Sequence, residues 1–393
     1  MAIAKNIIYM IEKSSWIRKM FEKGISLKNK FGADKVYDFS LGNPNISPPE
    51  KFKEELKKII NADISRKHSY MPNSGYPEVR DKVASYIGRE QGIDILKDNI
   101  IMTCGAGGGL NVALKTIINP GDIILSSTPC FMEYAFYTQN HGGSFQTVKG
   151  AFNFDIDIDA IKSNITSQTA GVIINSPNNP SGKVFPESTI KALGEMLEYK
   201  SKEIGRAIYL ISDEPYRKIV YDNVTIPSVF KFYKNSILVT SYSKDLSIPG
   251  ERIGFAAIHP EADDLKNLIN GMILCNRILG YVNAPALMQR TIANLQGISV
   301  DINKYKKKRD MLCKGLSDIG YEFAVPQGTF YLFPKAPGGD DLKFVDILQN
   351  ELILAVPGSG FSTPGYFRIA YCVEDNVIEH SMDGFARAFK AVY

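Results

Sequence analysis

Six short apolar runs dominate the middle of the chain, and each ends in a polar residue or a Gly/Pro break. They are of strand length and rich in Ile and Val: Ile100–Thr103, Ile123–Ser126, Val172–Asn175, Ile208–Ile211, Ile237–Thr240 and Ile253–Ile258. Helical patterns lie between several of them; after Gly109, for example, Leu110, Ala113, Leu114 and Ile117 follow one helix face. Continuous apolar strands that alternate with helices are typical of a parallel sheet covered on both faces. The pattern therefore predicts an α/β fold with a mostly parallel central sheet over residues 47–285.

The two ends of the chain follow a different pattern. The C-terminal part predicts helices, three strands at Thr329–Phe333, Ile353–Val356 and Phe367–Tyr371, and a closing helix from Asn376. Residues 1–23 carry apolar side chains at helical spacing among charged ones, which predicts an amphipathic helix that docks on the body or on a second subunit. We expect residues 1–46 and 286–393 to form a smaller α+β domain beside the large domain, 47–285.

Composition and charge exclude several classes of protein. The 393 residues are 44% hydrophobic, which is enough for a sizeable core. Lys+Arg minus Asp+Glu is 46 − 42 = +4, too small a surplus to indicate a nucleic acid or an anionic membrane as partner. The five cysteines are scattered and only four histidines are present, so we expect free thiols, a cytoplasmic location and no metal site. No apolar stretch approaches the roughly 18 residues of a membrane span.

Candidate chemistry follows the strands, because ligands of open α/β sheets bind beyond the carboxyl ends of the strands. Small residues, Cys104–Gly109, follow the first run. They form either a tight turn or a loop that lets a phosphate approach the N–H groups of a helix N-terminus. The segment is not a dinucleotide-binding fingerprint, because Leu110 holds the third glycine position.

The other strand ends carry one candidate group each. They are Phe131, Asn179 between Pro177 and Pro180, Asp213 with Tyr216, and Lys244 with Arg252 eight residues later. Each has an ordinary explanation, such as a core ring, a turn, a helix cap or a surface lysine. A desolvated lysine, however, has a lowered pKa and can form a Schiff base with a carbonyl. Taken together, the groups match the requirements of pyridoxal 5′-phosphate.

From Leu41-Gly42-Asn43-Pro44 to Phe367-Arg368-Ile369 the sequence resembles the class I/II aminotransferases, which are aspartate aminotransferase-like enzymes of pyridoxal-phosphate fold type I. The most specific motif is Ser-x-Ser-Lys…Pro-Gly-x-Arg-x-Gly, at Ser241–Gly254. Asn179–Gly182 and Asp213–Tyr216 support it with Asn-Pro-Ser-Gly and Asp-x-x-Tyr.

The resemblance implies a role for each candidate residue. Lys244 would bind the cofactor covalently and act as the general base and acid, and Asp213 would pair with the pyridinium nitrogen. The ring would contact Tyr216, Asn179 and, by stacking, Phe131. The phosphate would contact Gly105, Ala106, Gly107, Ser241, Ser243, Arg252 and, from the partner subunit of a homodimer, Tyr70. The substrate carboxylate would be held by Arg368, with Gly42 and Asn179 nearby.

The implied activity is ping-pong transamination between an L-amino acid and a 2-oxo acid through an aldimine and a ketimine. The substrate stays open between aspartate and an aromatic or neutral amino acid. Tyr281–Pro285 resembles a segment that follows a substrate-binding arginine of the partner subunit in dicarboxylate-specific relatives, but Arg277 lies one position away from the expected place.

Three alternatives to a transaminase remain open. A cysteine-S-conjugate β-lyase would share the same residues. A non-catalytic cofactor-binding regulator would need a DNA-binding domain, for which the segment before Gly42 leaves no room. A Rossmann dehydrogenase is disfavoured by Leu110.

Overall fold

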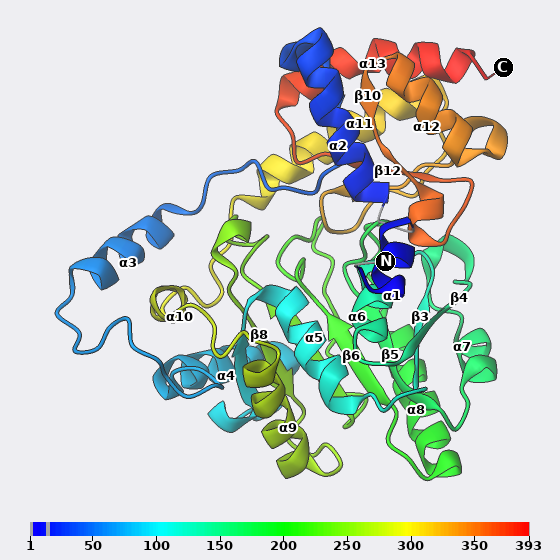
Figure 1. Ribbon diagram of the computed structural model, residues 1–393. Coiled ribbons are helices and arrows are strands. Elements are labelled where there is room, and N and C mark those ends of the chain that lie inside the picture. Colours follow the sequence, from blue (N-terminus) through cyan, green and yellow to red (C-terminus); the bar gives the residue numbers. More distant parts are fainter. Residues whose placement is uncertain (1–2, 13–15, 393) are drawn as a thin grey trace.

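A seven-stranded sheet lies at the centre of the computed structural model, which describes residues 3–12 and 16–392 (Figure 1). The strand order is β2-β8-β7-β6-β5-β3-β4. The strands are β2 (Ile100–Thr103), β3 (Ile123–Ser127), β4 (Ser144–Val148), β5 (Thr169–Asn175), β6 (Tyr209–Asp213), β7 (Ser236–Ser241) and β8 (Gly254–Ile258). The neighbours from β7 to β4 pair in parallel, whereas β8 is antiparallel to both β7 and β2. The predicted mostly parallel central sheet is confirmed.

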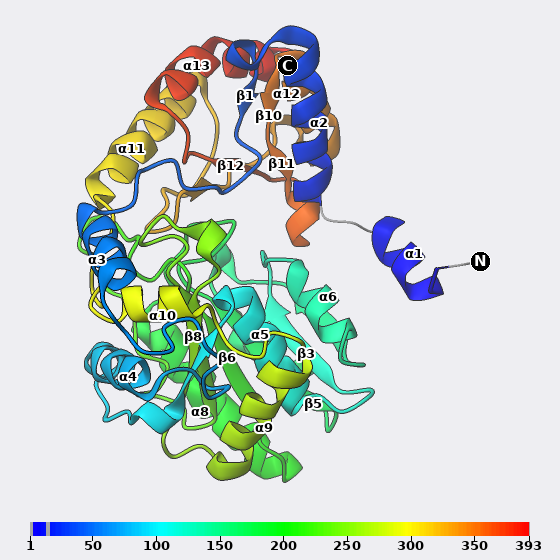
Figure 2. The same cartoon turned by 60° about the vertical axis from the view of Figure 1, so that its left-hand side comes forward.

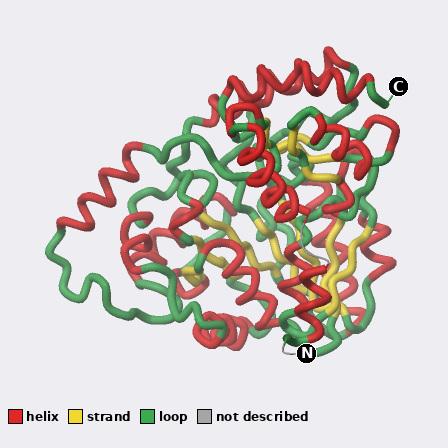
Figure 3. The backbone as a smooth tube through the Cα atoms, turned by 45° about the horizontal axis from the view of Figure 1, so that its top comes forward, coloured by secondary structure: helices red, strands yellow, loops and turns green. Residues whose placement is uncertain are grey.

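Both faces of this sheet are buried, which explains why its strands are continuous apolar runs. In β2, Ile100 and Met102 join one core while Ile101 joins the other. The helices α5 (Gly105–Ile117) and α9 (Leu265–Ile278) cover one face. The other face is covered by α4 (Pro77–Gln91), α7 (Ile158–Asn164), α8 (Glu187–Ile204) and α10 (Ala286–Ile292), and α10 packs against α3 (Glu50–Asn61) (Figure 2). Figure 3 shows the central strands between helices on either side.

Strand β4 is absent from the sequence prediction for a physical reason. It lies at the edge of the sheet, pairs only with β3 and exposes Ser144, Gln146 and Thr147. Because three of its five residues are exposed to solvent, its sequence lacks a continuous apolar run, whereas β2 at the opposite edge of the sheet is fully buried and keeps one. The short helix α6 (Glu133–Gln139) connects β3 to this strand.

A second core joins the two ends of the chain. Strand β1 (Tyr37–Asp38) pairs in parallel with β10 (Ile353–Leu354), and β12 (Phe367–Ala370) lies between β11 (Val356–Pro357) and β9 (Tyr331–Leu332). The helices around them are α2 (Trp16–Phe31), α11 (Ile302–Ile319), α12 (Asp341–Asn350) and α13 (Asp375–Lys390). Phe39, Leu312, Phe344, Phe367 and Phe385 are all fully buried there. Residues 284–295 pack into the core of the large sheet instead, and the division into domains stays a prediction.

The N-terminal segment contains two helices, α1 (Lys5–Glu12) and α2, of which α2 packs on the small core through Met20. Helix α1 stands apart from the body in Figure 2. Among the described helices, none combines the length and the apolar character needed to cross a membrane. All five cysteines are free thiols.

Candidate active site

A cavity of about 730 Å³ opens at the carboxyl ends of the parallel strands, between the large sheet and the small core. It brings together most of the site residues predicted from the sequence. Those that line it are Gly42, Ala106, Gly107, Phe131, Asn179, Asp213, Tyr216, Ser241, Ser243, Lys244, Arg252 and Arg368. Segments that are far apart in the sequence therefore meet at one place.

Lys244 follows β7, and its side chain is enclosed in the cavity. Its Nζ donates a hydrogen bond to the carbonyl oxygen of Gly42 at 2.8 Å and lies 5.6 Å from the centre of the Phe330 ring. Burial lowers the pKa of Lys244 to about 8, and the positive charges of Arg252 and Arg368 act in the same direction. An amine with this pKa is partly neutral, and hence nucleophilic, near neutral pH.

Asp213 ends strand β6 with one carboxylate oxygen paired and the other not. The hydroxyl of Tyr134 donates to Oδ2 at 2.5 Å, and the Asn175 amide donates to the backbone oxygen of Asp213 at 2.8 Å. Oδ1 is buried and has no hydrogen-bond partner among the described residues. Burial raises the pKa of Asp213 to about 7, against the effect of the Tyr134 hydrogen bond. A buried carboxylate oxygen of this kind is complementary to a protonated ring nitrogen.

The small residues after β2 form the first turn of helix α5, which begins at Gly105 rather than after Gly109 as the sequence suggested. The N–H groups of a first helical turn have no partner within the helix, and the helix dipole favours an anion there. Gly105 has φ +72°, and a Cβ at this position would lie 2.7 Å from Nη2 of Arg252. The guanidinium group thus lies beside the helix N-terminus, and together they suit a phosphate group.

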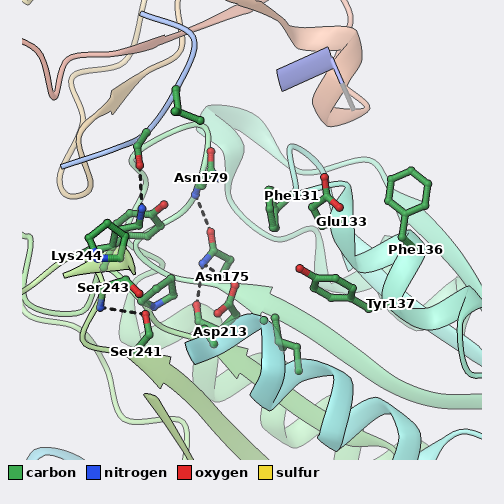
Figure 4. Close-up of a pocket in the computed structure, with 18 of the residues that line it drawn as sticks. Phe131, Glu133, Phe136, Tyr137, Asn175, Asn179, Asp213, Ser241, Ser243 and Lys244 are labelled. Carbon is green, nitrogen blue, oxygen red and sulfur yellow. Dashed lines mark hydrogen bonds between the residues drawn. The ribbon is translucent and has the colours of Figure 1, made fainter. Parts of the chain in front are cut away.

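Arg368, on β12, is 1% exposed. Its Nη1 donates to Asn179 Oδ1 at 3.0 Å and its Nη2 donates to the Ser40 carbonyl at 2.6 Å. Its Nε is buried without a partner among the described residues, and burial lowers the pKa of this arginine. The Asn179 backbone N–H donates in turn to Asn175 Oδ1 at 2.7 Å (Figure 4). A buried guanidinium that faces a cavity is complementary to a small carboxylate.

At Gly42 the N-terminal part of the chain lies very close to Tyr331, in the C-terminal part. A Cβ there would lie 1.8 Å from the hydroxyl oxygen of Tyr331. That hydroxyl is 3.0 Å from the hydroxyl of Tyr216. A side chain at position 42 would therefore displace Tyr331 and disturb the hydroxyl pair.

Two predicted residues lie elsewhere or play a supporting part. Tyr70 is 88% exposed and does not line the cavity of its own chain. Phe131 is half-buried, and its ring meets Tyr134 edge-on with 5.6 Å between centroids. Figure 4 shows Phe131 between Asn179 and the side chains of α6.

Several residues of the site were not identified from the sequence. Tyr134 and Asn175 contact Asp213, and Tyr331 contacts Tyr216. Others line the cavity from α1 and α6: Ile7, Met10, Ile11, Glu133, Phe136 and Tyr137. A signal existed for Asn175, which ends a predicted strand.

Comparisons with known proteins agree with this arrangement. Residues 34–385 match the family model of the class I and II aminotransferases. A probable aspartate aminotransferase of Methanocaldococcus jannaschii is 32% identical over 377 residues, which are 94% of this chain and 96% of that protein. The aromatic-amino-acid aminotransferase 2 of Thermococcus litoralis is 28% identical over 388 residues, 96% of each. A crystal structure of an amino transferase from Eubacterium rectale has 40% identity and a TM-score of 0.95, covering 100% of this chain and 99% of that one.

Proposed function

The chain belongs to the class I and II aminotransferases, which depend on pyridoxal 5′-phosphate, and from this premise we propose how its own residues divide the work of the reaction. The observation that carries the proposal is the meeting of the Lys244 amine, the unpartnered Asp213 Oδ1 and two arginines in one cavity. These groups are complementary to the aldehyde, ring nitrogen and phosphate of the cofactor and to the carboxylate of the substrate.

The cofactor would be held from three sides. Asp213 would pair with the ring nitrogen, Phe131 would stack on the ring, and Tyr216 and Asn179 would contact the ring hydroxyl group. The first turn of α5 and Arg252 would hold the phosphate, together with Ser241 and Ser243. When bound, pyridoxal 5′-phosphate supplies an electron-withdrawing ring that stabilises the negative charge left on the substrate Cα after its proton leaves.

Lys244 acts as the proton carrier. Its neutral Nζ removes the proton from the substrate Cα, and in the reverse half-reaction the same amine returns a proton to Cα. A pKa near 8 suits this exchange, since proton transfer is most efficient when the pKa of the group lies near the working pH. The Gly42 carbonyl, 2.8 Å away, orients the amine.

Arg368 binds the α-carboxylate that the amino acid and the 2-oxo acid share. One arginine therefore serves both half-reactions, and Asn179 fixes the orientation of its fork through the bond to Nη1. Among the relatives named above, one carries the name of an aspartate enzyme and another that of an aromatic-amino-acid enzyme, so both substrate classes are candidates.

The active unit in this proposal is a homodimer in the cytoplasm. Tyr70 is 88% exposed and does not line the cavity of its own chain, which suits a side chain that completes the phosphate site of a second copy. Five free thiols suit a reducing compartment.

The test of this function is Lys244→Ala in the holoenzyme. We expect loss of multiple-turnover transamination and of the visible absorbance of the lysine-bound cofactor. A matched control is Lys218→Ala, which removes another enclosed lysine, whose Nζ is 2.9 Å from Asp245 Oδ2 and which does not line the cavity; it should keep the absorbance. Full turnover by Lys244→Ala would refute the assignment, and release of pyruvate and ammonia without an acceptor acid would indicate a β-lyase.

A further inference from the structure

We propose that Tyr331 is a positioning residue for both halves of the site: its hydroxyl group donates a hydrogen bond to Tyr216, and its ring holds the guanidinium group of Arg368. Tyr216 then keeps its own proton for the ring oxygen of the cofactor. The inference rests on the proposed function, which assigns that oxygen to Tyr216 and the substrate carboxylate to Arg368. It adds one residue that contacts both of these side chains.

The register of two short strands places Tyr331 beside Arg368. Tyr331 begins β9 and pairs with Ala370 on β12. Arg368 lies two residues before Ala370, so its side chain leaves β12 on the same face, diagonally opposite Tyr331. The guanidinium carbon of Arg368 lies 4.5 Å from the centre of the Tyr331 ring. Backbone pairing therefore fixes the ring against the cation.

The aromatic ring restrains Arg368 in a way that its hydrogen bonds do not. Asn179 and Ser40 accept from the two terminal nitrogens, and these bonds act in the plane of the guanidinium group. Tyr331, and Phe361 with 5.0 Å between the guanidinium carbon and the ring centre, contact the group through their ring faces. An aromatic face attracts a cation most strongly in a desolvated site, and Arg368 is 1% exposed. Loss of the Tyr331 ring should therefore loosen the guanidinium group and weaken carboxylate binding.

The hydroxyl groups of Tyr331 and Tyr216 form a pair. Their oxygens are 3.0 Å apart, and the two rings meet edge-on with 5.7 Å between centroids. Both side chains line the cavity and are buried, at 3% and 5% exposure within a single chain, so the pair does not depend on a partner subunit. Two hydroxyl groups carry two protons, of which one is used inside the pair. The other proton is left for a partner outside it.

The charge of Arg368 favours Tyr331 as the donor of the pair. Burial raises the pKa of Tyr331, and the positive charge of Arg368 is the main effect that opposes this rise. Burial, followed by the effect of Tyr331, raises the pKa of Tyr216 well above its usual range. The more acidic hydroxyl group is the stronger donor. Tyr331 therefore donates to Tyr216, and the proton of Tyr216 stays available for the cofactor.

The first experiment titrates the visible absorbance of the lysine-bound cofactor against pH in Tyr331→Phe, which removes the hydroxyl group and keeps the ring. The ring oxygen shares a proton with the lysine nitrogen, and a donor to that oxygen stabilises its negative charge and lowers the pKa of the shared proton. We expect the midpoint to rise by about 0.5 to 1 pH unit, the size of one hydrogen bond. The matched control is Tyr371→Phe, which should not move the midpoint. It removes a hydroxyl group from a second buried tyrosine pair, 3.3 Å from that of Tyr221, and Tyr371 does not line the cavity.

The second experiment separates the ring from the hydroxyl group. Isothermal titration calorimetry of the holoenzyme with succinate and with 3-phenylpropanoate measures the binding of a carboxylate without reaction. Tyr331→Phe should leave each Kd nearly unchanged, whereas Tyr331→Leu should weaken binding about 5- to 30-fold, the size of a desolvated cation–π contact. Equal Kd values in the wild-type protein and Tyr331→Leu would overturn the part of the ring. Tyr331→Phe keeps every carbon atom of the side chain, so the absorbance titration decides the part of the hydroxyl group even if Tyr331→Leu does not fold.

The outcomes distinguish this inference from the proposed function. A wild-type protein that forms no lysine-bound absorbance with pyridoxal 5′-phosphate would refute the proposed function itself. A wild-type protein that forms it and transaminates, while the midpoint stays or falls in Tyr331→Phe, would overturn the donation to Tyr216 and leave the function in place. Weaker carboxylate binding by Tyr331→Phe would show that the hydroxyl group contacts the substrate directly, which also contradicts the proposal.

Discussion

The Tyr134 hydroxyl donates a hydrogen bond to Asp213 Oδ2, and at 2.5 Å it is the only side-chain hydroxyl in the described part of the chain that bonds this carboxylate. Tyr134 is fully buried. The bond fixes the carboxylate through one oxygen, and among the described residues Oδ1 has no hydrogen-bond partner. Tyr134 is thus a positioning residue for the proposed contact between Asp213 and the cofactor.

Replacing Tyr134 with Phe should weaken cofactor binding and lower kcat by about 10- to 100-fold. A hydrogen bond to a charged group contributes about 1.5 to 3 kcal/mol, and its loss also raises the pKa of Asp213 further. Cofactor titration of the apoenzyme and a pH profile of kcat measure both effects. Tyr233→Phe is the control, since its buried hydroxyl bonds the Ile208 carbonyl at 2.7 Å and is remote from the cavity. Equal cofactor affinity in the two variants would contradict the assignment.

Asp213→Asn should stabilise the cofactor-free protein in a pH-dependent way. Burial raises the pKa of Asp213 from 3.8 to about 7, so the wild-type protein loses stability as the pH rises from about 4 to 7. Asn does not titrate, and its advantage should grow over this range to at most about 4 kcal/mol. Urea unfolding at pH 5 and pH 8 measures the difference. A gain of the same size at both values would show that the Asp213 charge is not the cause.

Arg368→Lys should raise KM for both the amino acid and the 2-oxo acid about 100-fold, with a smaller change in kcat. Lysine keeps the charge but not the planar fork that bonds Asn179 and Ser40, and a mispaired buried charge costs about 2–5 kcal/mol of binding. Steady-state kinetics with each substrate varied in turn give the two constants. Arg309→Lys, at a buried arginine paired with Asp222 outside the cavity, should lower stability and leave KM unchanged.

Gly42→Ala should lower kcat/KM at least about tenfold, because its Cβ would lie 1.8 Å from the Tyr331 hydroxyl. In a Tyr331→Ser background the methyl group has room, so Gly42→Ala should lower kcat/KM much less in that variant than in the wild-type protein. The double-mutant cycle gives this coupling directly. Gly250→Ala is the control, since no atom of the described residues lies within 4 Å of a Cβ at that position. Additive effects of the two substitutions would exclude the contact as the cause.

The sequence predicted the large sheet and the end of it where the cavity lies, because a strand buried on both faces is a continuous apolar run. Strand β2 has the predicted bounds, and β7 differs by one residue at each end. An apolar run has no direction, however, so the reversal of β8 could not be derived from its pattern. The short strands β9 and β10 have only two residues each, and the longer runs around them gave no sign of where pairing would stop.

The site was predictable where a side chain follows a strand, as with Asp213 and Lys244. It was not predictable where long-range packing supplies the partner. Tyr331 reaches Tyr216 across a separation of 115 residues, and Tyr134 reaches Asp213 across 79. Nothing in the local pattern around either tyrosine indicates such a contact. The sequence therefore located side chains that line the cavity, and it did not locate the residues that orient them.

The reversed strand β8 has a consequence for how the protein can change. Because β8 returns antiparallel beside β7, the segment 242–253 begins and ends at the same edge of the sheet and carries both Lys244 and Arg252. Backbone pairing between β7 and β8 fixes both ends of this segment, so its length determines where Lys244 and Arg252 lie relative to each other. Inserting or deleting one residue in it would move the amine relative to the guanidinium group, whereas surface loops elsewhere tolerate such changes. We therefore expect insertions and deletions in the loops at the opposite ends of the strands. Within segment 242–253 we expect selection against them.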